Sequence, residues 1–244
     1  MMRLITSEFL RQLAEMRKFA FNLIFANLSL ITLFYWLLTQ MSGFENKSLT
    51  FFMLFCWYFA THAITHPSFF IEDEIYDRTV VSLLQSDIGL FSCLLIKIVI
   101  QILIDLVKSI PLFIILFALF REQLTLSPAF LASGLILSLL VVSGLYGLGM
   151  ALSSFIFISN KISHFASLLA YFSLFYSVLI VENKNLWFLN ILLPFDNLRN
   201  LLSAFTVKSF ALLSVQFLIY WLVAYVLFNF MQKKALKRGN LFDV

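Results

Sequence analysis

Long apolar runs separated by short polar stretches are the main pattern of this 244-residue chain. A helix needs about 20 predominantly apolar residues to cross the hydrocarbon core of a bilayer. Six runs come close to that length or exceed it: Phe19–Thr39, Leu49–Ile71, Gly89–Phe120, Leu126–Ile158, Ser163–Val181 and Ser209–Met231. The pattern therefore predicts an all-α membrane protein with six transmembrane helices. The third run is too long for a straight crossing, so we expect its first turns at the interface and a bend at Pro111.

Residues 1–18 precede the first run and carry several charges. Ser7 can cap a helix whose apolar residues share one face, namely Phe9, Leu13 and Met16. We expect an interfacial helix here and not a signal peptide, because no small-residue cleavage site follows a short apolar core.

Residues 186–206, between the fifth and sixth runs, are apolar but are interrupted by Pro194. Neither piece is long enough to cross a bilayer. We expect them to form a re-entrant hairpin of half-helices on the outer face, with protein or water around the broken backbone at Pro194.

The stretch Glu72–Ser86, between the second and third runs, is the densest cluster of charge in the chain. On a helix its apolar residues fall on one stripe: Tyr76, Val80, Leu83 and Leu84. Polar residues point the other way: Arg78, Thr79, Ser82, Gln85 and Ser86. The pattern predicts a short amphipathic helix in the membrane interface. The alternative is a solvated connector that binds no partner.

Lysine and arginine are unevenly divided between the two sides that six crossings define. The side with both termini and the Glu72–Ser86 stretch carries ten: Arg3, Arg11, Arg17, Lys18, Arg78, Lys161, Lys233, Lys234, Lys237 and Arg238. The other side carries five: Lys47, Arg121, Lys184, Arg199 and Lys208. Because cytoplasmic flanks are enriched in these residues, this distribution predicts that both termini are cytoplasmic.

Composition supports a membrane protein and excludes several other classes. Charged residues make up 12% of the chain, about half the share found in soluble domains, and 61% of residues are apolar. The length fits one transmembrane domain over residues 1–244. The net charge of +4 comes mostly from the chain ends, and no basic patch with interleaved aromatics indicates nucleic-acid binding. Cys56 and Cys93 lack a CxxC spacing, so we expect neither a disulfide nor a metal site from them.

The Glu72–Ser86 stretch also carries a family resemblance. An acid-rich start, Arg78-Thr79, the pair Leu83-Leu84 and a long apolar helix resemble the first cytoplasmic loop of type-2 ABC exporter permeases. The usual family pattern has Gly-Thr where this chain has Arg78-Thr79, and a proline turn where it has Gln85-Ser86. The elbow helix, the re-entrant element and the basic tail also have counterparts in that family.

The resemblance implies a permease subunit that moves an amphipathic or hydrophobic cargo (a peptide, lipid or drug) out of a bacterial cell across the plasma membrane. Glu72–Ser86 would be the coupling helix. It would dock on a separate ATP-binding cassette subunit through Asp73, Glu74, Asp77, Arg78 and Ser82. Its anchor to the spans would be Tyr76, Val80, Leu83 and Leu84. ATP and Mg would bind to the ATPase and no cofactor to this chain, and a second permease subunit, identical or related, would complete the pathway.

A polar face on the third run offers an alternative function. Its residues follow at steps of four, four and three: Lys97, Gln101, Asp105 and Lys108. Charges at membrane depth are functional candidates. They indicate either a structural polar seam or the relay of an ion-coupled secondary transporter.

The remaining motifs give no enzyme. The chain has no P-loop, HExxH or GxSxG motif, so we expect no ATPase site and no catalytic residue of its own. His62 and His66 have a spacing that can hold a metal, but no third ligand is evident, and packing is the simpler interpretation. Gly144, Gly147 and Gly149 lie inside an apolar run and indicate close helix packing, within or between subunits.

Overall fold

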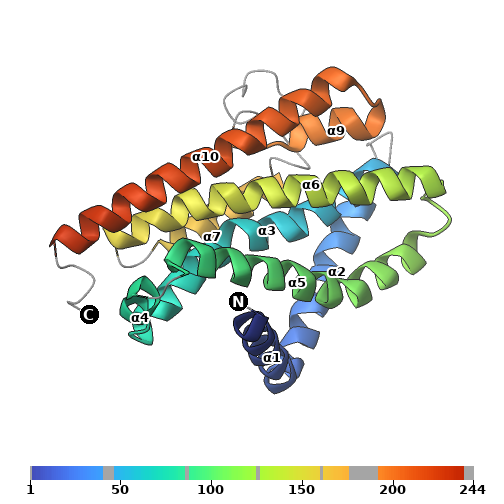
Figure 1. Cartoon of the computed structure of the whole chain (residues 1–244). Helices are drawn as coiled ribbons and strands as arrows, with labels where there is room; N and C mark the ends of the chain where they lie inside the picture. Colours follow the sequence, from blue (N-terminus) through green and yellow to red (C-terminus); the bar gives the residue numbers. More distant parts are fainter. Residues whose placement is uncertain are drawn as a thin grey trace. The chain divides into compact units, whose positions relative to one another are not determined.

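The computed structural model describes residues 2–40, 47–85, 88–124, 127–159, 162–175 and 192–238. All regular elements in these ranges are helices, which confirms the all-α prediction for this part of the chain (Figure 1). They are α1 Met2–Lys18, α2 Ala20–Gln40, α3 Lys47–Tyr76, α4 Val80–Gln85, α5 Leu90–Phe120, α6 Pro128–Ser153, the 3-10 turn η1 Ser154–Phe157, α7 Ser163–Phe175, α9 Phe195–Ser203 and α10 Val207–Arg238.

Five helices in the described ranges are long and apolar enough to cross a membrane: α2, α3, α5, α6 with η1, and α10. They match five of the six predicted spans. The length and apolar composition of these helices are those of a membrane-embedded helical protein. The predicted fifth span, Ser163–Val181, begins with the 13-residue helix α7. Its residues 176–181 lie outside the described residues, so a sixth span stays a prediction.

The chain forms two compact units, which share the continuous helices α3 and α5 and are described separately. Unit 1 contains α1, α2, the start of α3 and α5 from Leu95 onward. In unit 1, α2 contacts α5 through ring contacts of Phe34 with Phe113 and of Tyr35 with Phe120. Near the start of α5, Met16 of α1 contacts a buried isoleucine cluster made of Ile96, Ile100 and Ile104.

The N-terminal helix differs from its prediction in where it begins. It begins at Met2, so Ser7 lies inside the helix and is not its cap. The side of α1 that the protein buries runs through Gln12, whereas Phe9 is exposed. Phe9 is therefore available for lipid contact, whereas the side of α1 that meets the protein contains both Gln12 and Met16.

Unit 2 is built on three helices that run in the same direction: α3 from Phe52, α6 and α10 (Figure 1). The order of contacts gives the direction. Early in α6, Gly134 faces Phe52 of α3, and later Gly149 faces the backbone of Ala63. On α10, Phe217 lies against Gly144, and Phe228 makes a ring contact with Phe157 just after α6.

The glycines of α6 allow this close packing inside the chain. A Cβ on Gly144 would lie 1.9 Å from Cδ1 of Phe217, and one on Gly149 would lie 2.2 Å from the carbonyl oxygen of Ala63. Beside them, the indole Nε1 of Trp221 donates to the carbonyl of Ser143 at 3.1 Å. The predicted glycine packing is thus found between helices of one subunit.

Because α6 and α10 are parallel, the chain must return to the opposite end of unit 2 between them. Helix α7 begins beside Glu72, near the end of α3, and its Ala170 accepts a hydrogen bond from Nε1 of Trp57 at 3.1 Å. It therefore runs antiparallel to α3, in the direction that the return requires.

Helix α9 folds back along the first part of α10. Its apolar side is buried at Phe195, Leu198, Leu201 and Leu202. The hydroxyl of Tyr220 donates to the carbonyl of Leu192 at 2.8 Å. Tyr220 lies about 20 Å along α10 from its start, at 1.5 Å per residue, so the chain before α9 reaches well along α10. Helix α9 is thus a short helix that follows Pro194, and the re-entrant hairpin stays a prediction because residues 186–191 lie outside the described residues.

Candidate functional site

Helix α3 ends in a Schellman motif close to the centre of the predicted coupling helix. The backbone N–H of Thr79 donates to the carbonyl of Glu74 at 2.9 Å, and that of Arg78 donates to the carbonyl of Ile75 at 3.1 Å. This pair of bonds closes a helix around a residue in the left-handed region. Arg78 occupies that position with a φ of 58°. Glycine is favoured there because it has no Cβ, which gives a physical reason for the Gly-Thr of the family pattern.

The prediction of one continuous helix over Glu72–Ser86 is therefore wrong. Residues Glu72–Tyr76 belong to α3, the chain turns at Arg78, and α4 is a separate helix of six residues. The side chain of Ser82 donates to the carbonyl of Thr79 at 2.7 Å and supports the first turn of α4. Ser86 lies outside the described residues.

The break also changes the predicted apolar anchor. Val80 is buried, and Leu83 and Leu84 are half-buried, as an anchor requires. Tyr76, in contrast, is 85% exposed, because the turn at Arg78 removes it from the stripe that a continuous helix would form. Tyr76 is thus part of the exposed surface and not of the anchor.

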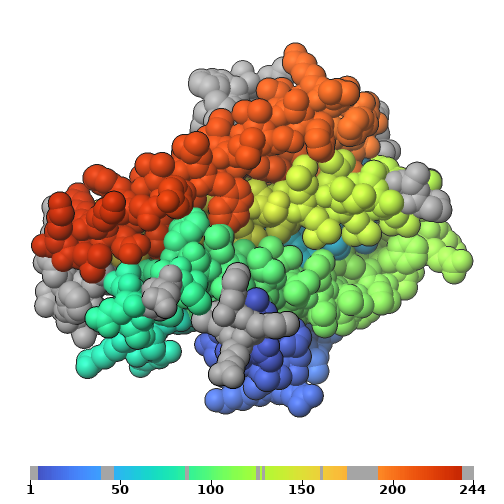
Figure 2. Space-filling model, viewed as in Figure 1, coloured from blue at the N-terminus to red at the C-terminus, as the bar shows by residue number. Residues whose placement is uncertain are grey.

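The predicted docking residues do not share one role. Asp73, Asp77, Arg78 and Ser82 are exposed, and Figure 2 shows this part of the chain at the surface. Glu74 is half-buried, and its carboxylate accepts a hydrogen bond from the hydroxyl of Thr79. Glu74 therefore holds the turn, which we name the docking turn and define as residues Tyr76–Thr79.

Glu72 was not among the predicted docking residues, yet it makes a long-range contact. Its Oε1 accepts hydrogen bonds from the backbone N–H groups of Ile162 at 3.0 Å and Ser163 at 2.9 Å. These groups belong to the start of α7, 90 residues later. No local sequence signal marks this contact, because an acidic residue at the end of an apolar run is also expected on the surface.

The predicted polar face of α5 is largely shielded from solvent. Lys97, Gln101 and Asp105 are buried, with Asp105 only 1% exposed, and Lys108 is half-buried. The side-chain amide of Gln101 donates to Oδ1 of Asp105 at 2.7 Å. We name Lys97, Gln101, Asp105 and Lys108 the polar seam of α5.

The start of this seam meets a charge on α1. Burial by itself raises the pKa of the Glu8 carboxyl. The opposite effects are larger: hydrogen bonds from Arg11 and Gln12 and the positive charges of Lys97 and Arg11. The pKa of Glu8 therefore lies below its ordinary range. Arg11 Nη2 lies 2.7 Å from Glu8 Oε1. An ionised Glu8 thus stabilises the contact of α1 with α5.

We expect this contact to weaken in acid. A carboxyl with a lowered pKa contributes stability above its unfolded pKa, and that contribution is lost as the pH falls through the folded value. Amide exchange in α1, corrected for its intrinsic pH dependence, should rise below about pH 5 in the wild type. The variant Glu8→Gln should show fast exchange at every pH. Glu15→Gln loses only an exposed ion pair with Arg11 at 3.5 Å, so it should stay close to the wild type. Equal pH profiles for wild type and Glu8→Gln would contradict the assignment.

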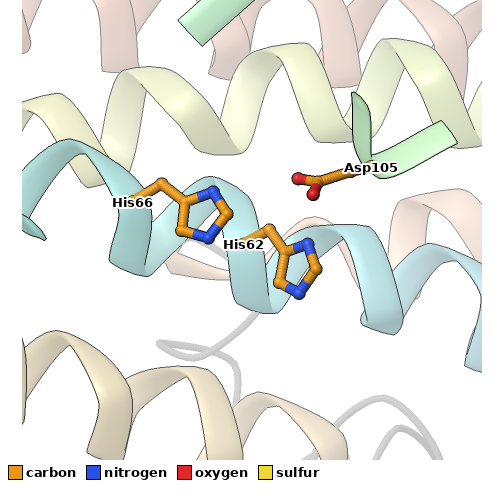
Figure 3. Close-up of side chains that lie close together, drawn as sticks. All are labelled: His62, His66 and Asp105. Atoms are coloured by element: carbon orange, nitrogen blue, oxygen red, sulfur yellow. The ribbon is translucent and has the colours of Figure 1, made fainter. Parts of the chain in front are cut away.

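The histidine pair lies in an aromatic column on α3. The rings of His62 and His66 stack with centroids 4.8 Å apart, and Tyr58 and Phe70 extend the column at its two ends. Figure 3 shows the two imidazoles one turn apart on α3. This packing accounts for the i, i+4 spacing, and metal binding by the pair stays a hypothesis.

Comparisons of the whole chain with protein-family models, curated proteins and solved structures gave no match. The features of the structure that bear on function are the docking turn, the polar seam and the helix directions.

Proposed function

We propose that this chain is the membrane subunit of an ABC exporter, and that the docking turn binds a separate ATP-binding cassette subunit. The single observation that carries the proposal is the exposed turn at the end of a membrane-length helix. It exposes Tyr76, Asp77 and Arg78, while Val80, the first residue after the turn, is buried. An aromatic ring and two opposite charges on a fixed turn are side chains of the kind that anchor protein interfaces.

Helix directions support six crossings. Since α3, α6 and α10 are parallel, two returning segments must lie between them along the chain, and α7 runs in the returning direction in unit 2. The residues that follow α7 would complete that crossing. Residues 186–206 would then re-enter from the outer side and leave again through α9.

The basic residues of unit 2 support a cytoplasmic docking turn. Arg78 lies just after α3, and Lys233, Lys234 and Lys237 lie near the end of α10, which is parallel to it. Arg199 and Lys208 lie at the opposite end of α10. By the positive-inside rule the first group is cytoplasmic, and with six crossings so are both termini.

Assembly and cargo follow from the same proposal. One six-span subunit forms half of a pathway, so two permease subunits would pair in the bilayer. The glycine positions of α6 are already filled by Phe217, Trp221 and the α3 backbone, so the subunits would pair through another surface. Few charges and thirty phenylalanines suit an amphipathic or hydrophobic cargo such as a peptide, lipid or drug.

The polar seam favours a second candidate, an ion-coupled secondary transporter. Buried Asp105, held by Gln101, and buried Lys97 lie on one membrane-length helix. Such groups can relay protons or bind ions. This candidate gives no role to the docking turn, so the two functions make different predictions for the same experiment.

The test is purification of the full chain from its native membrane in mild detergent, followed by photolabelling with an azido analogue of ATP. We expect the label on a co-purifying ATP-binding cassette protein and not on this chain, since the chain has no P-loop. Reconstitution of the pair should give transport that requires ATP hydrolysis. Transport by this chain alone, driven by an ion gradient and abolished by Asp105→Asn, would refute the exporter and support the second candidate.

A further inference from the structure

Glu72 joins two parts of unit 2 that are far apart in the sequence. One carboxylate oxygen accepts from two successive backbone N–H groups, those of Ile162 and Ser163, at 3.0 and 2.9 Å. Ser163 is the first residue of α7 and is buried. The contact is therefore a specific link from the end of α3 to the start of α7.

The link is strong for physical reasons. The first N–H groups of a helix have no partner within the helix, and the N-terminus carries a partial positive charge. A carboxylate accepts hydrogen bonds from these N–H groups, and its negative charge interacts favourably with the partial positive charge. Hydrogen bonds that involve a charged group are also stronger than neutral ones. A cap on α7 usually comes from the residue just before the helix, but here it comes from a different membrane helix.

Glu72 also lies one helical turn before the docking turn. Residues Glu72–Tyr76 are continuous α-helix, and the Schellman bonds join that helix to Arg78 and Thr79. A helical turn is stiff, so a displacement of the docking turn moves Glu72 with it. The hydrogen bonds of Glu72 then apply the displacement to the start of α7.

We propose that Glu72 is the positioning residue that transmits movement of the docking turn to α7. The inference rests on the proposed function, because an ATPase subunit is the source of the movement. It adds to that function the path by which a motion at the docking turn reaches a second membrane helix. Glu72 itself does not contact the ATPase in this scheme.

The experiment compares Glu72→Ala and Glu72→Gln with the wild-type chain, each reconstituted with the ATPase that co-purifies with the wild type. The matched control is Ser167→Ala. The hydroxyl of Ser167 donates to the carbonyl of Ser163 at 2.8 Å, so this variant removes a hydrogen bond from the same turn of α7 but none to α3. Three quantities are measured: amide exchange at Ile162 and Ser163, affinity for the ATPase, and cargo transported per ATP hydrolysed.

For Glu72→Ala we expect hydrogen exchange at the two amides to become about tenfold faster or more. A factor of this size is expected when hydrogen bonds to a charged acceptor are lost. ATPase affinity should stay within about twofold, since single changes away from a contact have small effects. The amount of cargo transported per ATP should fall about fivefold or more. Fivefold is at the lower end of the factors by which two coupled sites usually affect each other. Glu72→Gln keeps an oxygen acceptor and should recover part of the transport. Ser167→Ala should transport like the wild type.

The experiment distinguishes failure of the Glu72 link from failure of the proposed function. A Glu72→Ala protein that binds the ATPase and transports the wild-type amount per ATP would overturn this inference alone. The same holds if transport falls only in proportion to folded protein, or if Ser167→Ala loses as much as Glu72→Ala. A wild-type chain that binds no ATPase would overturn the proposed function and this inference with it.

Discussion

Replacing Gly149 with alanine is expected to lower the stability of the folded chain by about 3 kcal/mol, at the upper end of the usual cost of overpacking. The added Cβ would lie 2.2 Å from the carbonyl oxygen of Ala63 and 3.0 Å from that of Ile64. Both are backbone atoms of α3, so no side-chain rotation can remove the clash. Helices α3 and α6 would have to separate, with loss of the packing between them.

Two matched variants distinguish this backbone clash from ordinary crowding. Gly147→Ala would meet atoms of Tyr220 and Trp221 at 3.1–3.2 Å and should cost far less. Gly144→Ala would meet the ring of Phe217 at 1.9 Å. In a chain that already carries Phe217→Ala, it should therefore lower the stability much less than it does in the wild type. The measurement is the thermal midpoint of the purified chain in one detergent. A Gly149→Ala midpoint equal to that of Gly147→Ala would contradict the close approach of α3 and α6.

Most of the fold in the described ranges could be predicted because the bilayer imposes one simple requirement, the length of an apolar run. The predicted span Phe19–Thr39 corresponds to α2, Ala20–Gln40, with ends shifted by one residue. The end of α3 was missed because hydropathy marks where lipid contact stops and not where the helix stops. Charged residues such as Asp73 and Glu74 continue α3 beyond its apolar part.

Which face of a membrane helix meets protein could not be predicted, because lipid and protein interior are both apolar. In α1 the periodicity grouped Phe9, Leu13 and Met16 on one apolar face, yet Phe9 is exposed and Met16 packs against a buried isoleucine cluster. A polar residue at depth is the more informative signal, since it must be satisfied by protein. Gln101 and Asp105 illustrate this, because they were selected from the sequence and both are buried.

The candidate site was found from the sequence only in part. The charge cluster and the unusual Arg78 could be recognised, but the turn at Arg78 depends on a backbone conformation that a helical-wheel pattern does not contain. Glu72 could not be assigned because its partners are backbone N–H groups 90 and 91 residues away. Backbone donors leave no trace in side-chain composition.

Exchanging the charges of the docking turn, with Asp77→Arg and Arg78→Asp together, is expected to weaken binding of the ATPase by about 2 kcal/mol or more, roughly a 30-fold rise in Kd. Both side chains are exposed in the free chain, where an isolated surface charge contributes only about 0–1 kcal/mol. The larger effect arises when each charge is buried against an unlike charge on the partner and the exchange brings like charges together. Aspartate tolerates the left-handed conformation better than arginine, so the turn itself should be retained.

The control is Arg78→Gly, which removes the side chain and relieves the conformation at φ 58°. If the guanidinium of Arg78 binds the ATPase, this variant should be at least as stable as the wild type yet bind more weakly. If Arg78 only shapes the turn, the Arg78→Gly variant should bind the ATPase as well as the wild type does. Membrane insertion of both variants is checked first, and ATPase affinity is then titrated in detergent or nanodiscs. An exchanged variant that inserts, binds with the wild-type Kd and transports at the wild-type rate would remove the docking turn from the mechanism. The polar seam of α5, with Asp105 and Lys97, would then be the better candidate for the site that drives transport.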